Sequence, residues 1–278
     1  MRALSDAFKA YLAACRSETL ALSTLPPGRF LMPGDMEDSP ALTFAPLVNI
    51  SEKTIPGSNQ AMMERRYEAY KKLVVKPFFR EHITRLDRQI VLVDAMQAIN
   101  AGPEAVADLE RALVEIMGCF RPGAGNLLTS LWKRRIDKIL VAATKADHLH
   151  HEQHPALTDL IGAMTASARD RADFSGAKTQ AMSLAALRTT TETTVGDNLP
   201  AVQGKILETG KNAAYYPGDM PTSPTAILAE ARNGADDWEA GPIASMRFGP
   251  PAMKVGAGDG PPHIRMDKAL QFLIGDLL

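Results

Sequence analysis

Short apolar runs alternate with helical patterns along much of the chain. Gln89–Asp94 and Ile136–Ala143 are apolar and rich in β-branched residues, and a third strand is predicted near Met182–Arg188. Runs of this kind are typical of strands that are buried on both faces of a parallel sheet. Because helical segments separate them, they predict βαβ units and an α/β fold in which helices cover the sheet.

Apolar positions at helical spacing predict the helices that accompany these strands. Four such segments are residues 4–20, 60–86, 155–170 and 264–275. Pro77 is expected to kink or divide the second of them, because proline lacks the backbone N–H that a helix interior needs. Pro103 and Gly118 are placed to begin and end a further helix.

Two long stretches lack such periodicity and are rich in glycine and proline. Residues 25–58 predict an irregular loop, and a loop of this length indicates an insertion with a role of its own. Residues 196–262 predict a loop-rich excursion with a possible hairpin formed by Val202–Leu207 and Ile243–Phe248. The predicted organisation is a main α/β part over 1–195 with a helical and loop insertion at 25–86, then the 196–262 excursion and a closing helix in 263–278.

Composition and charge exclude several classes of protein. The 31 basic and 32 acidic residues nearly balance, so no overall positive field attracts nucleic acid or an anionic membrane. Cys15 and Cys119 are too few for a disulfide framework, which favours a reducing compartment. No segment contains the roughly 20 apolar residues that span a bilayer, and the first residues do not follow a signal-peptide pattern. We therefore expect a cytoplasmic protein without a nucleic-acid partner.

The sharpest candidate for chemistry is Thr144-Lys145-Ala146-Asp147, directly after the second apolar run. Ligands of open α/β sheets bind beyond the carboxyl ends of the strands. A carboxylate there can accept two parallel N–H bonds, which guanine offers and adenine does not. Asp147 would then recognise the base, while Lys145 would lay its aliphatic stem over the ring and Thr144 would hold the turn. The alternative is a solvated turn, and the four residues alone leave both interpretations open.

Phosphate-binding chemistry has no counterpart in these 278 residues. A P-loop requires G-x-x-x-x-G-K-[ST] after a strand, and no stretch of the chain matches it. Gly123–Asn126 lacks the following lysine, while Gly204-Lys205 and Gly210-Lys211 lack the hydroxyl residue. Ser175–Lys178 is interpreted as the end of a helix.

Other polar clusters have simpler interpretations. His148, His150, His151 and His154 follow the second strand, but their spacing matches no closed zinc site, so we predict a solvated loop and no metal. Asp94 is interpreted as the cap of the next helix. A basic stretch is interpreted as a solvated face whose tyrosines lie in the core; it contains Arg65, Arg66, Lys71 and Lys72.

Several stretches resemble the YcjX-like family of bacterial stress-associated P-loop GTPases over essentially the whole chain. They are Pro27–Asp35, Ser39–Phe44, Arg66–Lys71, Val75–Arg80, Leu86–Asp94, Arg134–His148 and His263–Gly275. The resemblance implies a partial Ras-like P-loop NTPase sheet with additional helices and loop-rich insertions. It also implies that Thr144, Lys145 and Asp147 recognise guanine and that backbone near Leu187, Arg188 and Thr189 contacts the base.

The resemblance further implies GTP or GDP with Mg²⁺ as ligands of a complete protein. Members of the family carry the phosphate loop upstream of the region matched here, so we expect a chain truncated at its N-terminus. Alone, it should bind nucleotide weakly and hydrolyse none. A second hypothesis is a non-catalytic interaction module that binds a protein partner through 25–58 or 196–262.

Overall fold

The computed structural model describes residues 2–17, 19–23, 33–37, 39–48, 50, 53–119, 136–234, 238, 243–244, 246–251 and 260–278. The chain forms two compact units, Met1–Leu86 and Asp87–Leu278. Much of the predicted 25–58 loop and part of the predicted 243–248 strand therefore lie outside the described residues.

The first unit is helical. Its elements are α1 (Arg2–Cys15), η1 (Gly34–Met36), η2 (Pro40–Leu42), α3 (Asn59–Tyr70), the π-helical turn η3 (Lys71–Val75), α4 (Lys76–Glu81) and η4 (Ile83–Arg85). Leu12 of α1 packs with Leu42, Phe44, Met63 and Tyr70 in one buried cluster. α1, η2 and α3 thus contribute apolar side chains to one small core within this unit.

Pro77 alters the helix in which it lies, as predicted. In η3 the backbone N–H of Lys76 donates to the carbonyl of Lys71, which is the wider π-type bond. Proline cannot fit into a regular turn without a clash with the carbonyl four residues earlier. The wider turn before Pro77 separates α3 from α4, so the predicted 60–86 helix becomes two helices joined at this point.

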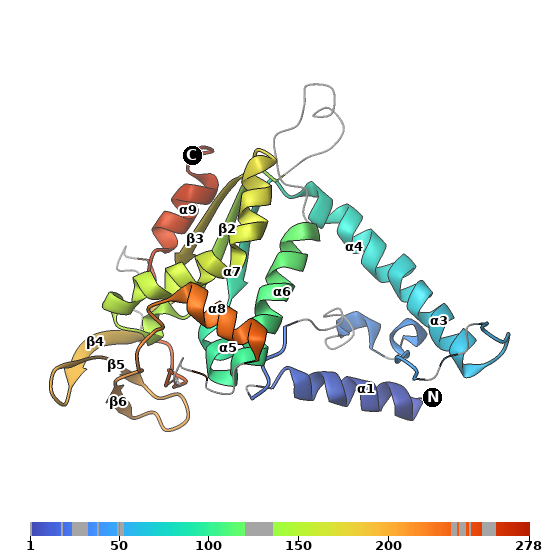
Figure 1. The fold of residues 1–278 in the computed structure, drawn as a ribbon, viewed down its shortest axis with the longest axis horizontal. Coiled ribbons are helices and arrows are strands. Elements are labelled where there is room, and N and C mark those ends of the chain that lie inside the picture. The colour runs from blue at the N-terminus through green and yellow to red at the C-terminus, as the bar shows by residue number, and fades with distance from the viewer. Residues whose placement is uncertain are drawn as a thin grey trace. The chain divides into compact units, whose positions relative to one another are not determined.

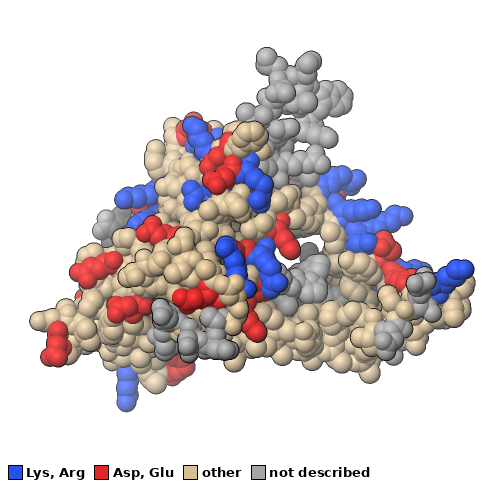
Figure 2. Space-filling view, in the orientation of Figure 1, with Lys and Arg blue, Asp and Glu red and all other residues tan. Residues whose placement is uncertain are grey.

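Basic side chains follow α3 and α4 on the face shown in Figure 2. Lys71 forms an ion pair of 2.5 Å with Glu68, and Arg66 donates to the carbonyl of Thr43. Tyr70 is buried, but Tyr67 is 46% exposed. The solvated basic face is therefore as predicted, whereas only one of the two tyrosines lies in the core.

The second unit is built on a parallel sheet in the order β1-β2-β3. Its strands are β1 (Arg88–Val93), β2 (Lys138–Ala143) and β3 (Lys178–Ser183), and its helices are α5 (Ala95–Ala101), α6 (Pro103–Cys119), α7 (His154–Phe174), α8 (Pro224–Asn233) and α9 (Met266–Ile274). In register, Leu140 of β2 pairs with Ile90 of β1 and Gln180 of β3. The predicted α/β fold with a parallel, helix-covered sheet is confirmed.

Helices cover the two faces of this sheet, as Figure 1 shows. Leu140 and Ala142 lie in a buried cluster with Ala269 and Leu273 of α9. Successive strand residues point to opposite faces, so the intervening residues of β2 face α7, which contacts both β2 and β3. The four residues from Ile139 to Ala142 are fully buried, which explains why β2 is the plainest apolar run in the sequence.

β1 forms an edge of the sheet among the described residues, because it pairs only with β2. Its inner side chains, Val91 and Val93, are buried. On the α9 side, Ile90 is 36% exposed and Leu92 is 61% exposed. The edge strand therefore leaves both unpaired backbone groups and apolar surface accessible.

β3 does not occupy the predicted range Met182–Arg188. Only the last two of its six residues are buried, so its polar first half carries no hydrophobic pattern. The preceding turn includes Gly176 at φ +92°, just after α7 ends at Phe174, which confirms that Ser175–Lys178 ends a helix. After the strand, the backbone of Ala185 pairs with Ile264 instead of continuing along β2.

A second, antiparallel sheet follows, in the order β4-β5-β6. Its strands are β4 (Thr190–Val195), β5 (Leu199–Lys205) and β6 (Asn212–Tyr215). β5 pairs along its length with β4 and β6. The two segments of the predicted hairpin, Val202–Leu207 and Ile243–Phe248, meet where the N–H of Leu207 donates to the carbonyl of Arg247 (2.8 Å). One isolated bridge, between Ile206 and Phe248, joins the two predicted segments. Within the described ranges, no helix has the length and apolar character needed to cross a membrane.

Candidate nucleotide-recognition site

The turn after β2 is fixed by backbone bonds to both neighbouring strands. The N–H of Thr144 donates to the carbonyl of Val93 at the end of β1 (2.8 Å), and its hydroxyl donates to the same oxygen (3.2 Å). The N–H of Ala146 donates to the carbonyl of Leu184 beyond β3 (3.1 Å). Between them Lys145 adopts φ +61°, a left-handed conformation that is uncommon for a residue with a side chain. These bonds place Asp147 at the carboxyl edge of the sheet.

Asp147 is buried, with 4% of its surface exposed, and its carboxylate is held from a distant segment. Its Oδ2 accepts from the N–H of Thr189 (2.8 Å) and from the hydroxyl of Thr189 (2.6 Å). The hydroxyl of Thr190 donates to the backbone carbonyl of Asp147. Each carboxylate oxygen accepts about two hydrogen bonds, so Thr189 saturates Oδ2. Among the described residues, no hydrogen bond to Oδ1 accompanies these two.

Lys145 and Asp94 form an ion pair of 2.5 Å at the ends of β2 and β1. Asp94 also accepts from the N–H of Gln97 (3.2 Å), which confirms its predicted role as the cap of α5. The side chain of Lys145 is 48% exposed. Its ammonium is thus held beside the sheet edge while its aliphatic part remains accessible to a ligand.

The side chain of His154 stabilises the turn after β2 by hydrogen bonding. It is 2% exposed, and its Nε2–H donates to the carbonyl of Ala146 (2.7 Å). Nδ1 accepts from Arg265 (3.3 Å), whose guanidinium also donates to the carbonyl of Ser183 (3.1 Å). Burial lowers the pKa of His154, and the charge of Arg265 acts in the same direction. The imidazole is therefore neutral at pH 7 and links the turn after β2 to the end of β3.

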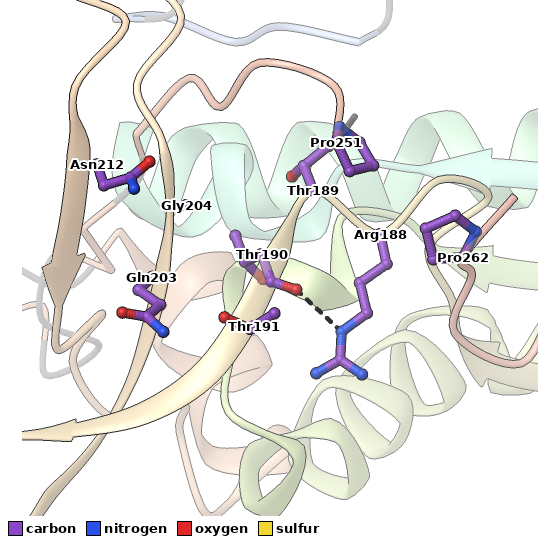
Figure 3. A pocket seen from close by; sticks show the side chains of 9 residues that line it. All are labelled: Arg188, Thr189, Thr190, Thr191, Gln203, Gly204, Asn212, Pro251 and Pro262. Atoms are coloured by element: carbon purple, nitrogen blue, oxygen red, sulfur yellow. Dashed lines mark hydrogen bonds between the residues drawn. The ribbon is translucent and has the colours of Figure 1, made fainter. Parts of the chain in front are cut away.

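A pocket of about 500 Å³ lies on the other side of Thr189 and Thr190 from the turn after β2 and is shown in Figure 3. It is lined by Arg188, Thr189, Thr190, Thr191, Gln203, Gly204, Asn212, Pro251 and Pro262. Asp147 does not line it, but Thr189 both lines the pocket and holds the carboxylate. The Nε–H of Arg188 donates to the carbonyl of Thr190 (3.0 Å), the bond drawn in Figure 3.

The structure brings together most of the residues singled out from the sequence. Thr144, Lys145 and Asp147 share one turn, and Arg188 lies beside the pocket, with its N–H bonded to the carbonyl of Pro262. Leu187 precedes it and, among the described residues, makes no hydrogen bond with the turn. Thr189, the last residue of the predicted loop, is the one that bonds Asp147.

Sequence reasoning missed the supporting residues of the site. They are Thr190, Ser183, His154 and Arg265. All four act through backbone carbonyls or through one another, and such contacts depend on segments that are far apart in the chain. No local pattern identifies them.

A parallel α/β sheet with a Thr-Lys-x-Asp turn after its central strand, in which the aspartate is buried, has the architecture of a partial Ras-like P-loop nucleotide-binding fold. A family model described as "YcjX-like family, DUF463" matches residues 1–278, and the chain belongs to that family. Two similar proteins both carry the name "Ras-like GTPase YcjX". The one from Escherichia coli K12 is 36% identical over 286 positions, and the one from Shewanella oneidensis is 33% identical over 267.

The matches differ in how much of each protein they cover. The alignment takes in 99% of this chain but 59% of the Escherichia coli protein. For the Shewanella protein the corresponding shares are 91% and 53%. The chain therefore spans somewhat more than half the length of the curated relatives it matches.

Proposed function

We propose that this chain carries the guanine-recognising part of a GTP-binding site. The observation behind the proposal is the buried carboxylate of Asp147 at the carboxyl edge of the parallel sheet, oriented through Oδ2 by Thr189. Ligands of open α/β sheets bind at this edge. A carboxylate held by protein donors on one oxygen presents the other in a fixed direction.

Guanine suits this acceptor because its ring N–H and exocyclic amino group lie side by side on one edge, so both could donate to Oδ1, the oxygen that Thr189 does not bond. Adenine has an unprotonated ring nitrogen at the corresponding position, so it would leave the buried carboxylate facing an acceptor. Sites built to bond a donor discriminate strongly against analogues that lack it, because the buried group then stays unpaired. Asp147 would thus select guanine over adenine.

Lys145 and the segment after β3 would complete the base site. The accessible stem of Lys145 can lie against the face of the base while its ammonium keeps the ion pair with Asp94. Thr144 fixes the turn through two bonds to Val93. Leu187 and Arg188 lie next to Thr189, so their backbone would border the base.

The phosphates and Mg²⁺ would be bound by elements outside these 278 residues. The sequence holds no P-loop motif, and Asp94, the carboxylate at the end of β1, is already engaged by Lys145 and Gln97. The described residues of this site therefore do not fit a Mg²⁺ ion. The accessible edge of β1, with Ile90 and Leu92 exposed, supports pairing with further strands that would supply the phosphate-binding part.

The test compares nucleosides and nucleotides separately. For the 278-residue chain, ligand-observed NMR should detect weak binding of guanosine and none of adenosine at the same concentration. In the longest reading frame that contains the chain, GTP should bind tightly in the presence of Mg²⁺. Tight, Mg²⁺-dependent GTP binding by the 278 residues alone would contradict the proposal that the phosphates and Mg²⁺ are bound by elements outside them.

A substitution at Asp147 tests the recognition itself. Asp147→Asn replaces one acceptor oxygen by an NH₂ donor, so GTP binding should weaken and xanthosine triphosphate, which presents a carbonyl there, should bind better. Asp159→Asn, at an exposed position of α7, makes the same charge change away from the site. If the two variants bind GTP equally well, Asp147 does not recognise the base.

A second candidate function is binding of a protein partner through residues 25–58. Three apolar side chains in this stretch are largely exposed: Val48 at 89%, Ile50 at 62% and Ile55 at 66%. The three lie within eight residues of the sequence, and a contiguous patch of exposed apolar groups is a feature of interaction surfaces. Replacing all three by serine should abolish co-purification of a partner while leaving guanosine binding unchanged.

A further inference from the structure

The loop after the Asp147 turn carries two adjacent histidines and a glutamate whose side chains converge. Each of His150, His151 and Glu152 offers one ligand atom, and these atoms lie within 4.8 Å of one another. The two imidazole rings are 4.4 Å apart between centroids and inclined by 40°. Glu192, from β4, joins the group: its Oε2 is 2.9 Å from Nδ1 of His151. The cluster thus combines residues from two separate segments.

His150 is not the solvated loop residue that the sequence suggested. It is 9% exposed, and its Nδ1 is a buried atom with no hydrogen-bond partner among the described residues. Oε2 of Glu152 lies 3.7 Å from this nitrogen. Buried polar atoms are nearly always satisfied by a hydrogen bond, a water or an ion. The orphaned nitrogen faces a carboxylate at a separation too long for a hydrogen bond.

That separation suits two ligands of one metal ion. Bonds of about 2.0–2.2 Å from zinc to nitrogen or oxygen place neighbouring tetrahedral ligands roughly 3.3–3.5 Å apart. The 3.7 Å between Nδ1 of His150 and Oε2 of Glu152 differs from this by a few tenths of an ångström. The exposed side chain of Glu152 can close that difference by a small rotation.

Glu192 fixes the second histidine in the tautomer that a metal requires. The hydrogen bond between Glu192 and His151 requires the proton on Nδ1, because a carboxylate can only accept. Nε2 of His151 is then the unprotonated nitrogen with its lone pair available. A carboxylate behind a ligating histidine is a recurrent feature of zinc sites, where it orients the ring and raises its basicity.

We propose that His150, His151 and Glu152 bind a divalent transition metal of the zinc class, with Glu192 as the positioning carboxylate of His151. Two imidazoles and one carboxylate suit zinc better than magnesium or calcium, which prefer oxygen ligands alone. Three protein ligands leave the fourth tetrahedral position for water or a partner group. The site does not include Asp147, so the test of metal binding is independent of the test of guanine recognition.

The experiment titrates the 278-residue chain with Zn²⁺ by calorimetry and with Co²⁺ by visible absorption. We expect one tight ion per chain and the intense visible bands of tetrahedral Co²⁺. Glu152→Gln and His151→Ala alter exposed side chains, so both variants should fold, and each should weaken Zn²⁺ binding. Glu192→Gln should weaken it by about 10–100-fold, the usual effect of losing such a carboxylate.

Matched controls separate this site from adventitious binding. His263→Ala removes an exposed histidine outside the cluster, and Glu208→Gln neutralises an exposed glutamate elsewhere. Both should bind Zn²⁺ like the original chain. The proposal is overturned if the original chain binds no stoichiometric Zn²⁺, or if the controls lose as much affinity as Glu152→Gln and His151→Ala. Thermal melts without metal verify that each variant is folded.

Discussion

The two sheets of the larger unit differ in what their side chains contribute. β2 of the parallel sheet is apolar, and five of its six residues are buried. β4 of the antiparallel sheet is mostly threonine, and only its first residue is buried. The parallel sheet fixes where the turn at Asp147 lies, whereas Thr189 and β4 supply the polar groups that hold it. The parallel sheet thus sets the position of Asp147, and the segment around β4 supplies the groups that hydrogen-bond to it.

The largest expected effect is on the parallel sheet. Leu140→Ala removes a fully buried side chain that packs against α9. We expect a loss of about 2–5 kcal/mol in the free energy of unfolding, from lost burial and the cavity that remains. Urea denaturation measures it. Thr194→Ala, at an exposed position of β4, should change stability by less than about 0.5 kcal/mol. If both substitutions lowered the free energy of unfolding equally, the two sheets would not differ in how much these side chains stabilise them.

Thr189→Val tests the hydrogen bond between the hydroxyl of Thr189, the residue before β4, and the carboxylate of Asp147. The valine keeps the shape but loses the hydroxyl that donates to Oδ2 of Asp147 at 2.6 Å. A hydrogen bond to a charged group contributes about 1.5–3 kcal/mol, and the backbone N–H of residue 189 continues to donate. We expect a stability loss in that range, together with weaker guanosine binding. Unchanged stability would show that the hydroxyl does not hold the carboxylate.

Gly204→Ala tests how closely β5 approaches its neighbours. A Cβ at this position would lie 2.6 Å from a ring carbon of Phe248 and 3.0 Å from the carbonyl of Thr189. Overpacking of this kind costs typically about 1–3 kcal/mol. Because one of the two neighbours is backbone, relaxation would also displace Thr189. Thermal denaturation measures the cost, and Gly118→Ala, where a Cβ meets nothing within 4 Å, is the control.

The expected effect that appears only at high pH concerns Tyr215 of β6, which packs on Phe248. Burial raises its pKa to about 12, so the folded chain keeps the phenol proton more firmly than the unfolded chain. The unfolded phenol ionises near pH 10. The stabilisation is therefore complete below about pH 10 and is lost as the pH rises from there through about 12. In urea melts the original chain should lose stability relative to Tyr215→Phe over this interval, and a constant difference between the two would contradict the assignment.

Sequence patterns were most informative where burial is complete. The apolar run of β2, the periodicity of α7 and α9 and the cap at Asp94 all depend on neighbours within a few residues. The Thr-Lys-x-Asp turn was visible for the same reason, since it directly follows a buried strand. β3 was misplaced because its exposed first half has no apolar pattern.

The polar strands and the supporting contacts required the three-dimensional arrangement. Thr189 lies 42 residues beyond Asp147, and Arg265 lies 111 residues beyond His154. The burial of His150 likewise depends on elements that pack around it, which a count of nearby histidines does not reveal.

From its residues alone, this chain specified a parallel α/β sheet, a carboxylate after its central strand and membership of a GTPase-like family. Those features follow from apolar periodicity and contiguous motifs, which are local properties. The fold settled which oxygen of Asp147 is already bonded, which strand is an exposed edge, and which histidine is buried without a partner. These depend on hydrogen bonds and packing between segments that are distant in sequence, and such contacts form only when the chain folds.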